Sequence, residues 1–185
     1  YEGRHKNTET DFVGTITAIK NSGCEMLVLG PLVKDTILIY SAARDAGWDA
    51  PIISNMVSYV AEVAEAANGA TEGLYSASSS YVPDFKAAEP GSWLANWYTE
   101  YVSRFGEEPA PQSLIGYTSA DLVVRALEAA GRDLTVEKVL AALESIDYYE
   151  DPFGGPSMSF SPTKHQGGDY LRFYQVQDGK WVTVE

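Results

Sequence analysis

Residues 45–58, with the sequence DAGWDAPIISNMVS, decide the fold because they join the end of one helical pattern to the start of another through a short strand. Gly47 is typical of the position that follows a helix. The apolar run at residues 51–53 is too short for a helix and predicts a buried strand. Ser-Asn-Met at residues 54–56 then lies at the carboxyl end of that strand.

The same alternation of strands and helices extends to both sides of this stretch. The predicted strands span residues 26–29, 51–53 and 73–77, and the predicted helices span residues 33–46 and 56–67, with another between Asp11 and Gly23. Short apolar strands that alternate with amphipathic helices are typical of a parallel sheet with helices packed on it. The sequence therefore predicts the α/β class.

Parallel strands end at the same edge of their sheet, and α/β proteins bind ligands outside that edge. The loops at residues 30–32, 54–56 and 78–81 follow the three predicted strands. We therefore expect these loops to lie side by side. Ser54 and Asn55 also suit the position that caps the next helix, so a purely structural role for both remains an alternative.

The segment beyond residue 81 has a different pattern, with three predicted helices and no convincing strand between them. The first places Trp93, Trp97, Tyr101 and Phe105 three or four residues apart, and the others span residues 113–130 and 136–146. Such an aromatic stripe must pack against something. The chain does not offer these helices a sheet of their own.

The C-terminal residues predict a β-hairpin. The segments 169–177 and 180–184 flank Asp178-Gly179, a dipeptide that favours a tight turn between antiparallel strands. The apolar positions of the hairpin are Tyr170, Phe173, Tyr174, Trp181 and Val184.

Composition excludes several classes of function. The net charge of −13 leaves no basic surface for nucleic acid, and it favours solubility or, as an alternative, attraction of cationic ligands. One cysteine cannot form an internal disulfide, and the two histidines and Cys24 do not have the spacing of a metal site.

No apolar run approaches the ~18 residues of a membrane span. A signal peptide is absent from these residues.

Motifs for catalysis are also absent from the sequence. It contains neither a dinucleotide-binding glycine pattern nor a phosphate loop. His165 lies in a loop without the pattern of a catalytic triad, and the paired carboxylates fall in predicted loops. We therefore expect no enzyme, no catalytic residue, no metal and no cofactor.

Five segments in order resemble the C-terminal half of type I periplasmic binding proteins, in the leucine/isoleucine/valine-binding branch that supplies ABC importers. They are TDFVGTITAIKNSGCEMLVLG (10–30), AARDAGWDAPIIS (42–54), ATEGLYSAS (70–78), WYTEYVSRFGEEPAPQSLIGYTSADLVVRALEAAG (97–131) and FSPTKHQGGDYLRFYQVQDGKWVTV (160–184).

The resemblance implies a two-lobed solute receptor whose lobes close over a ligand. Residues 1–80 and 165–185 would form part of lobe two, and residues 81–164 would cross over and add helices to lobe one. The N-terminal half of the protein, with the rest of lobe one and the first strand and helix of lobe two, would be missing from this chain. The partners implied are a small molecule and the permease subunits, and the location is periplasmic or extracellular.

The strand-end argument and the resemblance point to the same ligand-binding candidates. They are Pro31, Leu32, Ser54, Asn55, Met56 and Tyr81, with Gln112 added from lobe one by the resemblance alone. Ser54 and Asn55 would supply hydrogen bonds, and Leu32, Met56 and Tyr81 would supply apolar or stacking contacts.

One departure from the family pattern bears on the ligand. In the amino-acid binders of the family, an acid at or next to the position of Met56 pairs with the ammonium group of the ligand. A buried cation needs such a partner. Within the amino-acid-like range, an aromatic or branched carboxylate or an amide therefore fits better than an α-amino acid.

Two other classes of function remain as alternatives. The same fold serves as the ligand-sensing domain of signalling receptors and regulators, which the rest of the gene would reveal. A doubly wound α/β enzyme would need a catalytic group at the strand ends, where Leu32, Asn55 and Met56 are poor candidates.

Overall fold

The computed structural model describes residues 1–184, and Glu185 lies outside the described residues. Its helices are α1 (Val13–Asn21), α2 (Val33–Asp45), α3 (Ala61–Ala64), α4 (Trp93–Phe105), α5 (Pro111–Ala130) and α6 (Val136–Glu144), with short 3-10 helices η1 (Met56–Ser58), η2 (Ala67–Gly69) and η3 (Phe85–Ala87). Its strands are β1 (Leu27–Leu29), β2 (Ile52–Ser54), β3 (Tyr75–Ser78), β4 (Arg172–Gln177) and β5 (Lys180–Val184).

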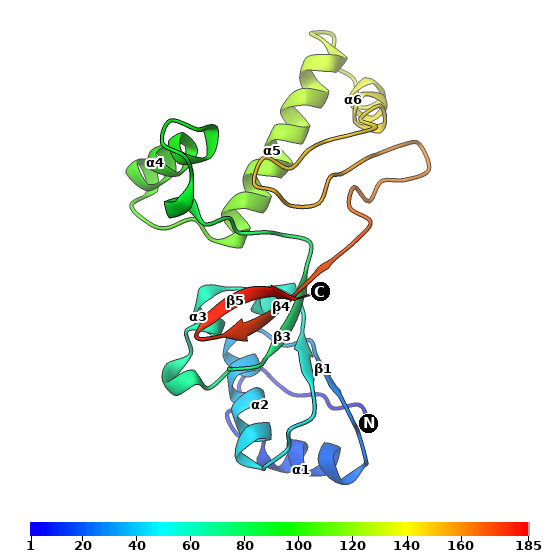
Figure 1. Ribbon diagram of the computed structural model, residues 1–185. Coiled ribbons are helices and arrows are strands. Elements are labelled where there is room, and N and C mark those ends of the chain that lie inside the picture. The colour runs from blue at the N-terminus through cyan, green and yellow to red at the C-terminus, as the bar shows by residue number, and fades with distance from the viewer. Residues whose placement is uncertain (185) are drawn as a thin grey trace. The chain divides into compact units, whose positions relative to one another are not determined.

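The chain divides into two compact units, which are described separately below. The first unit contains Tyr1–Ser78 and the C-terminal segment from Arg172, and the second contains Ser79–Leu171 (Figure 1). In the described part of the chain, no helix combines the length and the apolar character that crossing a membrane requires.

One mixed sheet forms the centre of the first unit, in the order β1-β2-β3-β4-β5. The first three strands are parallel, with Leu29 opposite Ser54 and Ser54 opposite Ser76. The C-terminal hairpin joins β3 in antiparallel orientation, and Figure 1 shows it in red beside β3. The predicted α/β class, parallel strands and hairpin are therefore confirmed.

One face of this sheet packs against α1, α2 and α3 in a single core. The core includes Ile16 from α1, Tyr40 from α2 and Val63 from α3, and Ile52 and Val176 from the sheet, all at most 1% exposed. The spacing of Phe12, Ile16 and Ile19 predicts that they share the inward face of α1, and all three are buried. Burial of this apolar surface is the main source of stability in the unit.

The other face of the sheet is largely apolar and exposed. It follows from the alternation of side chains along a strand that Val28, Phe173 and Val182 share this face, and they are 74%, 48% and 39% exposed. The apolar run at residues 26–29 predicts a buried strand, and this is wrong for Met26 and Val28, which are exposed. The physical reason is that β1 lies at the edge of the sheet and the helices of this unit pack on its opposite face.

The predicted helix at residues 56–67 is also wrong, because the segment forms η1, α3 and η2 instead. Val60 has extended backbone, with φ −137° and ψ 159°, and its carbonyl accepts a hydrogen bond from the indole of Trp181. Asn68 adopts a left-handed conformation within η2. The Val60 carbonyl thus accepts from the indole of Trp181 in addition to the backbone N–H groups of Val63 and Ala64.

The tight turn between β4 and β5 has the conformation expected from its sequence. Asp178 and Gly179 both have positive φ, at 52° and 72°. This is the mirror-image turn whose twist matches that of the flanking strands. The turn directs Tyr174 and Val176 into the core, whereas Phe173 points to the exposed face.

In the second unit, the three predicted helices are confirmed as α4, α5 and α6. The aromatic side chains of α4 stack on one another, with ring centroids 6.3 Å apart for Trp93–Trp97 and 5.2 Å for Trp97–Tyr101. Phe153 packs edge-on against Trp97. Trp93 and Phe105 nevertheless remain 45% and 58% exposed.

Candidate functional site

The carboxyl ends of β1 and β2 bring two loops to one edge of the first unit. The strand-end edge is defined here as residues 30–32 and 54–58. Leu29 pairs with Ser54, and Ser54 pairs with Ser76. The residues that come directly after Leu29 and Ser54 in the sequence therefore lie next to one another. The loops after β1 and β2 are therefore neighbours, as predicted, whereas residues 79–81 of the third predicted loop belong to the second unit.

The loop after β1 presents one apolar side chain to solvent. Pro31 is buried, whereas Leu32 is 55% exposed. Leu32 precedes the first helical residue of α2 and has extended backbone, with φ −77° and ψ 172°. The start of α2 thus determines where the Leu32 side chain lies.

The loop after β2 contains one buried hydroxyl, one amide and one exposed thioether. Ser54 is 3% exposed and donates a hydrogen bond to the carbonyl of Tyr75, at 3.2 Å. The amide oxygen of Asn55 accepts from the backbone N–H of Val57 at 3.1 Å, as the capping alternative predicts. Met56 is 43% exposed.

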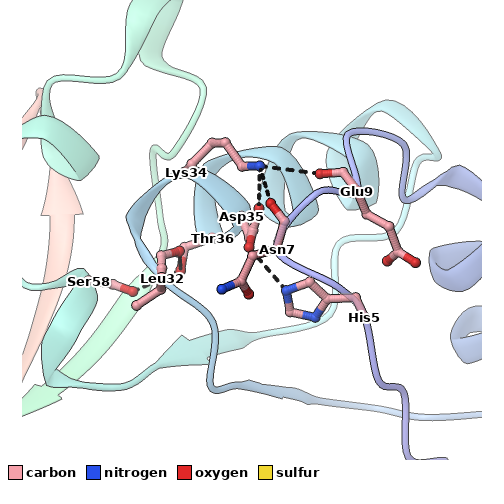
Figure 2. Close-up of polar contacts among 8 residues, drawn as sticks. All are labelled: His5, Asn7, Glu9, Leu32, Lys34, Asp35, Thr36 and Ser58. Carbon is pink, nitrogen blue, oxygen red and sulfur yellow. Dashed lines mark hydrogen bonds and ion pairs between the residues drawn. The ribbon is translucent and has the colours of Figure 1, made fainter.

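Two buried hydroxyls behind these loops connect them. The Oγ1 of Thr36 lies 2.8 Å from the Oγ of Ser58 and donates to the carbonyl of Leu32 at 3.1 Å (Figure 2). Both hydroxyl residues are fully inaccessible. Sequence reasoning missed this pair. The four-residue spacing from Leu32 to Thr36, at which a helical threonine bonds a carbonyl, was the only signal for it.

A buried carboxylate lies beside this pair, on the first turn of α2. The Oδ2 of Asp35 is 3.1 Å from the Nε2 of His5, and its Oδ1 is 3.2 Å from the Nζ of Lys34 (Figure 2). Lys34 also donates to the carbonyls of Asn7 and Glu9. Residues 5–9 are thereby held against α2, a contact that the sequence did not predict.

The electrostatics of Asp35 favour its charged form. Burial is the largest contribution and raises the pKa, but the hydrogen bonds and positive charges of Lys34 and His5 together outweigh it. The pKa of Asp35 is therefore below its usual value. Its charge is compensated within the protein.

The other two candidates, Tyr81 and Gln112, belong to the second unit. The ring of Tyr81 lies near Gly154, and Gln112 is exposed in the first turn of α5. The remaining candidates, Pro31, Leu32, Ser54, Asn55 and Met56, lie on the strand-end edge of the first unit. In the described residues, no group of three histidine, cysteine or acidic side chains could hold a metal ion.

A family model described as periplasmic binding protein matches residues 1–180. The chain belongs to the periplasmic binding protein family. This family consists of solute-binding proteins rather than enzymes, and it implies a periplasmic or extracellular location. No curated protein matches the chain.

Solved structures of this family share the fold of the chain at low sequence identity. A branched-chain amino acid ABC transporter protein from Thermus thermophilus with bound valine is 19% identical, with a TM-score of 0.81 over 99% of this chain and 50% of that one. A fatty acid ABC transporter substrate-binding protein from Thermomonospora curvata is 23% identical, with a TM-score of 0.75 over 98% and 47%. A solute-binding protein from R. palustris in complex with benzoate is 17% identical, with a TM-score of 0.71 over 97% and 48%.

The solved structures are longer than this chain. The periplasmic binding protein chain described here spans about half the length of each solved structure that it matches. Almost all of the chain takes part in each match, so both of its units have counterparts in the longer proteins.

Proposed function

We propose that the protein is an extracytoplasmic solute receptor that captures a small molecule for an ABC importer. The observation that supports this most directly is the exposure of Leu32 and Met56 on the strand-end edge of a parallel sheet. Ligands of α/β proteins bind at such edges, and pockets combine apolar walls with a few polar groups. Asn55 provides the polar group between the two apolar side chains.

We further propose distinct roles for the residues of the edge. Leu32 and Met56 contact the apolar part of the ligand, and the amide of Asn55 orients its polar part. Ser54 shapes the edge rather than binding directly, because its hydroxyl is buried and bonded to Tyr75. Pro31, also buried, holds the loop that presents Leu32.

The opposite wall of the ligand cleft belongs, in this proposal, to a second lobe. Residues 1–80 and 165–185 form part of lobe two, and residues 81–164 cross over and supply helices, with Tyr81 and Gln112, to lobe one. We propose that a further segment of the same protein completes both lobes. This proposal is supported by relatives that are about twice as long as this chain. The exposed sheet face around Val28 and Phe173 is the surface it would cover.

The chemistry of the edge favours a ligand without an ammonium group. By the resemblance to the family, Met56 lies at or next to the position where its amino-acid binders have an acid. Asp35 is buried and paired with Lys34 and His5. An unpaired cation in a closed cleft would be strongly disfavoured. We therefore propose an aromatic or branched carboxylate, or an amide, as the ligand class. Among relatives, one structure contains benzoate and another contains valine.

Native mass spectrometry is the first test of this proposal. A retained small-molecule mass would identify the ligand directly. Calorimetric titration with benzoate, benzamide and valine follows, on the polypeptide that includes the proposed additional segment. We expect benzoate or benzamide to bind more tightly than valine, and tighter binding of valine would contradict the proposed ligand class.

Substitution of Met56 tests its contact with the ligand. We expect Met56→Ala to weaken binding about tenfold, because a buried methionine side chain contributes roughly this much. Met26→Ala is the matched control, since Met26 is also an exposed methionine but lies before the amino end of β1. Equal affinities of the two variants would exclude Met56 from the site.

Deletion of the gene distinguishes the importer from the alternative of a sensory domain. We expect the deletion strain to lose uptake of the identified ligand, and we expect uptake to return when the gene is reintroduced. Unchanged uptake, together with a changed transcriptional or motile response to the ligand, would indicate a signalling receptor with the same fold.

A further inference from the structure

Three groups behind the strand-end edge form a directed chain of hydrogen bonds. The Leu32 carbonyl can only accept, and Thr36 donates to it at 3.1 Å. A hydroxyl has one hydrogen, so Thr36 must accept at its 2.8 Å contact with Ser58. The order is therefore Ser58 to Thr36 to Leu32, and Figure 2 shows these three residues together.

This chain of hydrogen bonds crosses from one loop of the edge to the other. Leu32 ends the loop after β1, and Ser58 is the last residue of η1, which follows the loop after β2. Met56 is the first residue of that short helix. The chain of hydrogen bonds therefore joins the loop that carries the exposed Leu32 side chain to the short helix that carries the exposed Met56 side chain. The length of these hydrogen bonds thus bears directly on the spacing between Leu32 and Met56.

Burial strengthens this chain of hydrogen bonds, which is called the link below. Thr36 and Ser58 are both 0% exposed, so water cannot replace either partner. A buried hydroxyl that loses its partner has a large desolvation cost. The hydroxyls also lie beside regular backbone bonds, from the Thr36 N–H to Leu32 at 2.9 Å and from the Ser58 N–H to Asn55 at 3.1 Å.

Each end of the link is also held from outside. The first turn of α2 is held by Asp35, which contacts His5, and by Lys34, which donates to the carbonyls of Asn7 and Glu9. The carbonyl of Asn55 accepts a hydrogen bond from Ser76 of β3 at 3.1 Å. The link therefore connects two elements that are each fixed to a different part of the unit.

We propose that Thr36 and Ser58 are positioning residues for the ligand site, and that their hydroxyl pair sets the separation of the Leu32 and Met56 loops. This inference rests on the proposed function for its biological meaning. Neither residue touches the ligand. They act by keeping the two apolar contacts at a fixed spacing before the ligand arrives, which reduces the ordering cost of binding.

Hydrogen exchange of the 185-residue chain tests the mechanical part of this proposal without a ligand. Thr36→Val removes the hydroxyl and keeps the shape of the side chain, whereas Thr36→Ser keeps the hydroxyl. We expect Thr36→Val to accelerate exchange of the Thr36 and Ser58 amides by about fivefold or more, relative to the rest of the unit. Thr36→Ser should restore most of the protection.

Thr71→Val is the matched control. Thr71 is also a fully buried threonine, and its hydroxyl donates to the carbonyl of Val63 away from the edge. This variant should change the stability of the unit without selective exposure of residues 32–36 and 55–58. Equal patterns of exchange in Thr36→Val and Thr71→Val would overturn the proposal.

Two further measurements keep the test decisive if Thr36→Val does not fold. Ser58→Ala removes the same contact with a smaller loss of volume and should selectively expose the Thr36 amide. In the wild type, the amides of Thr36 and Ser58 should open together as denaturant is added. Independent opening of these amides would contradict the link.

Ligand binding then separates this inference from the proposed function. With benzoate as the probe, on the longer polypeptide proposed above, Thr36→Val should weaken binding about fivefold more than Thr71→Val. Absence of benzoate binding in the wild type would count against the ligand class alone, because the exchange result does not depend on it. Wild-type binding with unchanged affinity in Thr36→Val would overturn the positioning role.

Discussion

At the scale of single residues, the first turn of α2 contains two buried polar side chains, those of Asp35 and Thr36. Asp35 and Thr36 are adjacent in sequence and face different partners. Asp35 contacts His5 and Lys34, and Thr36 contacts Ser58. Both side chains are almost completely inaccessible. Their contacts therefore connect the first turn of α2 to residue 5 on one side and to residue 58 on the other.

Asp35 predicts acid sensitivity. Its pKa is lower in the folded chain than in the unfolded chain, so the charged form stabilises the fold above the usual aspartate range. This contribution is lost as the pH falls through the lowered pKa. We expect Asp35→Asn to destabilise the first unit by about 1 kcal/mol at neutral pH, and the difference from wild type to shrink in acid.

Denaturation curves at a series of pH values measure this effect. Asp133→Asn is the control, because Asp133 pairs with Lys138 but its side chain is 92% exposed. It should leave stability unchanged at every pH. A pH-independent difference between Asp35→Asn and wild type would contradict the assignment of the charge to Asp35.

At the scale of elements, contacts between the hairpin and the preceding segment decide the local structure of both. The indole of Trp181 bonds the carbonyl of Val60, and the ring of Tyr59 stacks on Tyr174 with centroids 4.2 Å apart. Tyr59 and Val60 lie between η1 and α3, where the helical pattern of residues 56–67 is interrupted. They also attach β5 to the core beside α3.

The hairpin turn predicts a substitution effect with a defined sign. Gly179 has φ 72°, a conformation that side chains with a Cβ rarely adopt. We expect Gly179→Ala to destabilise the first unit by about 1 kcal/mol, as measured by chemical denaturation. The control is Gly14→Ala, because Gly14 lies in α1 with open space around it and alanine favours a helix. A stabilising effect of both variants would mean that the turn tolerates a Cβ.

At the scale of the whole molecule, each unit has apolar surface that its own elements do not cover. In the first unit, this surface is the sheet face with Val28 and Phe173. In the second unit, it includes Trp93 on α4 and Val123 and Val124 on α5. Large exposed apolar patches on a soluble chain mark surfaces of interaction.

This exposure predicts that the 185-residue chain associates with itself when it is studied alone. We expect light scattering after size exclusion to give a mass above the 20.1 kDa of one chain, increasing with concentration. Val28→Thr with Val124→Lys should reduce the mass, whereas Val13→Thr, an exposed valine outside these surfaces, should not. A monomer at all concentrations would indicate that these faces do not drive association.

The sequence alone determined most elements and their kinds, because the evidence for them is local. Apolar periodicity located α1, α2 and β2, and Asp178-Gly179 located the hairpin, since turn conformation depends on a few adjacent residues. The shared edge of Leu32 and Met56 also followed, because parallel strands end on one side of a sheet. Only the tertiary structure decided the break at Val60, the exposure of Val28 and the links from Thr36 to Ser58 and from Asp35 to His5. These depend on contacts between residues 22 to 121 positions apart, and on which face of the sheet the helices cover, neither of which a local pattern can specify.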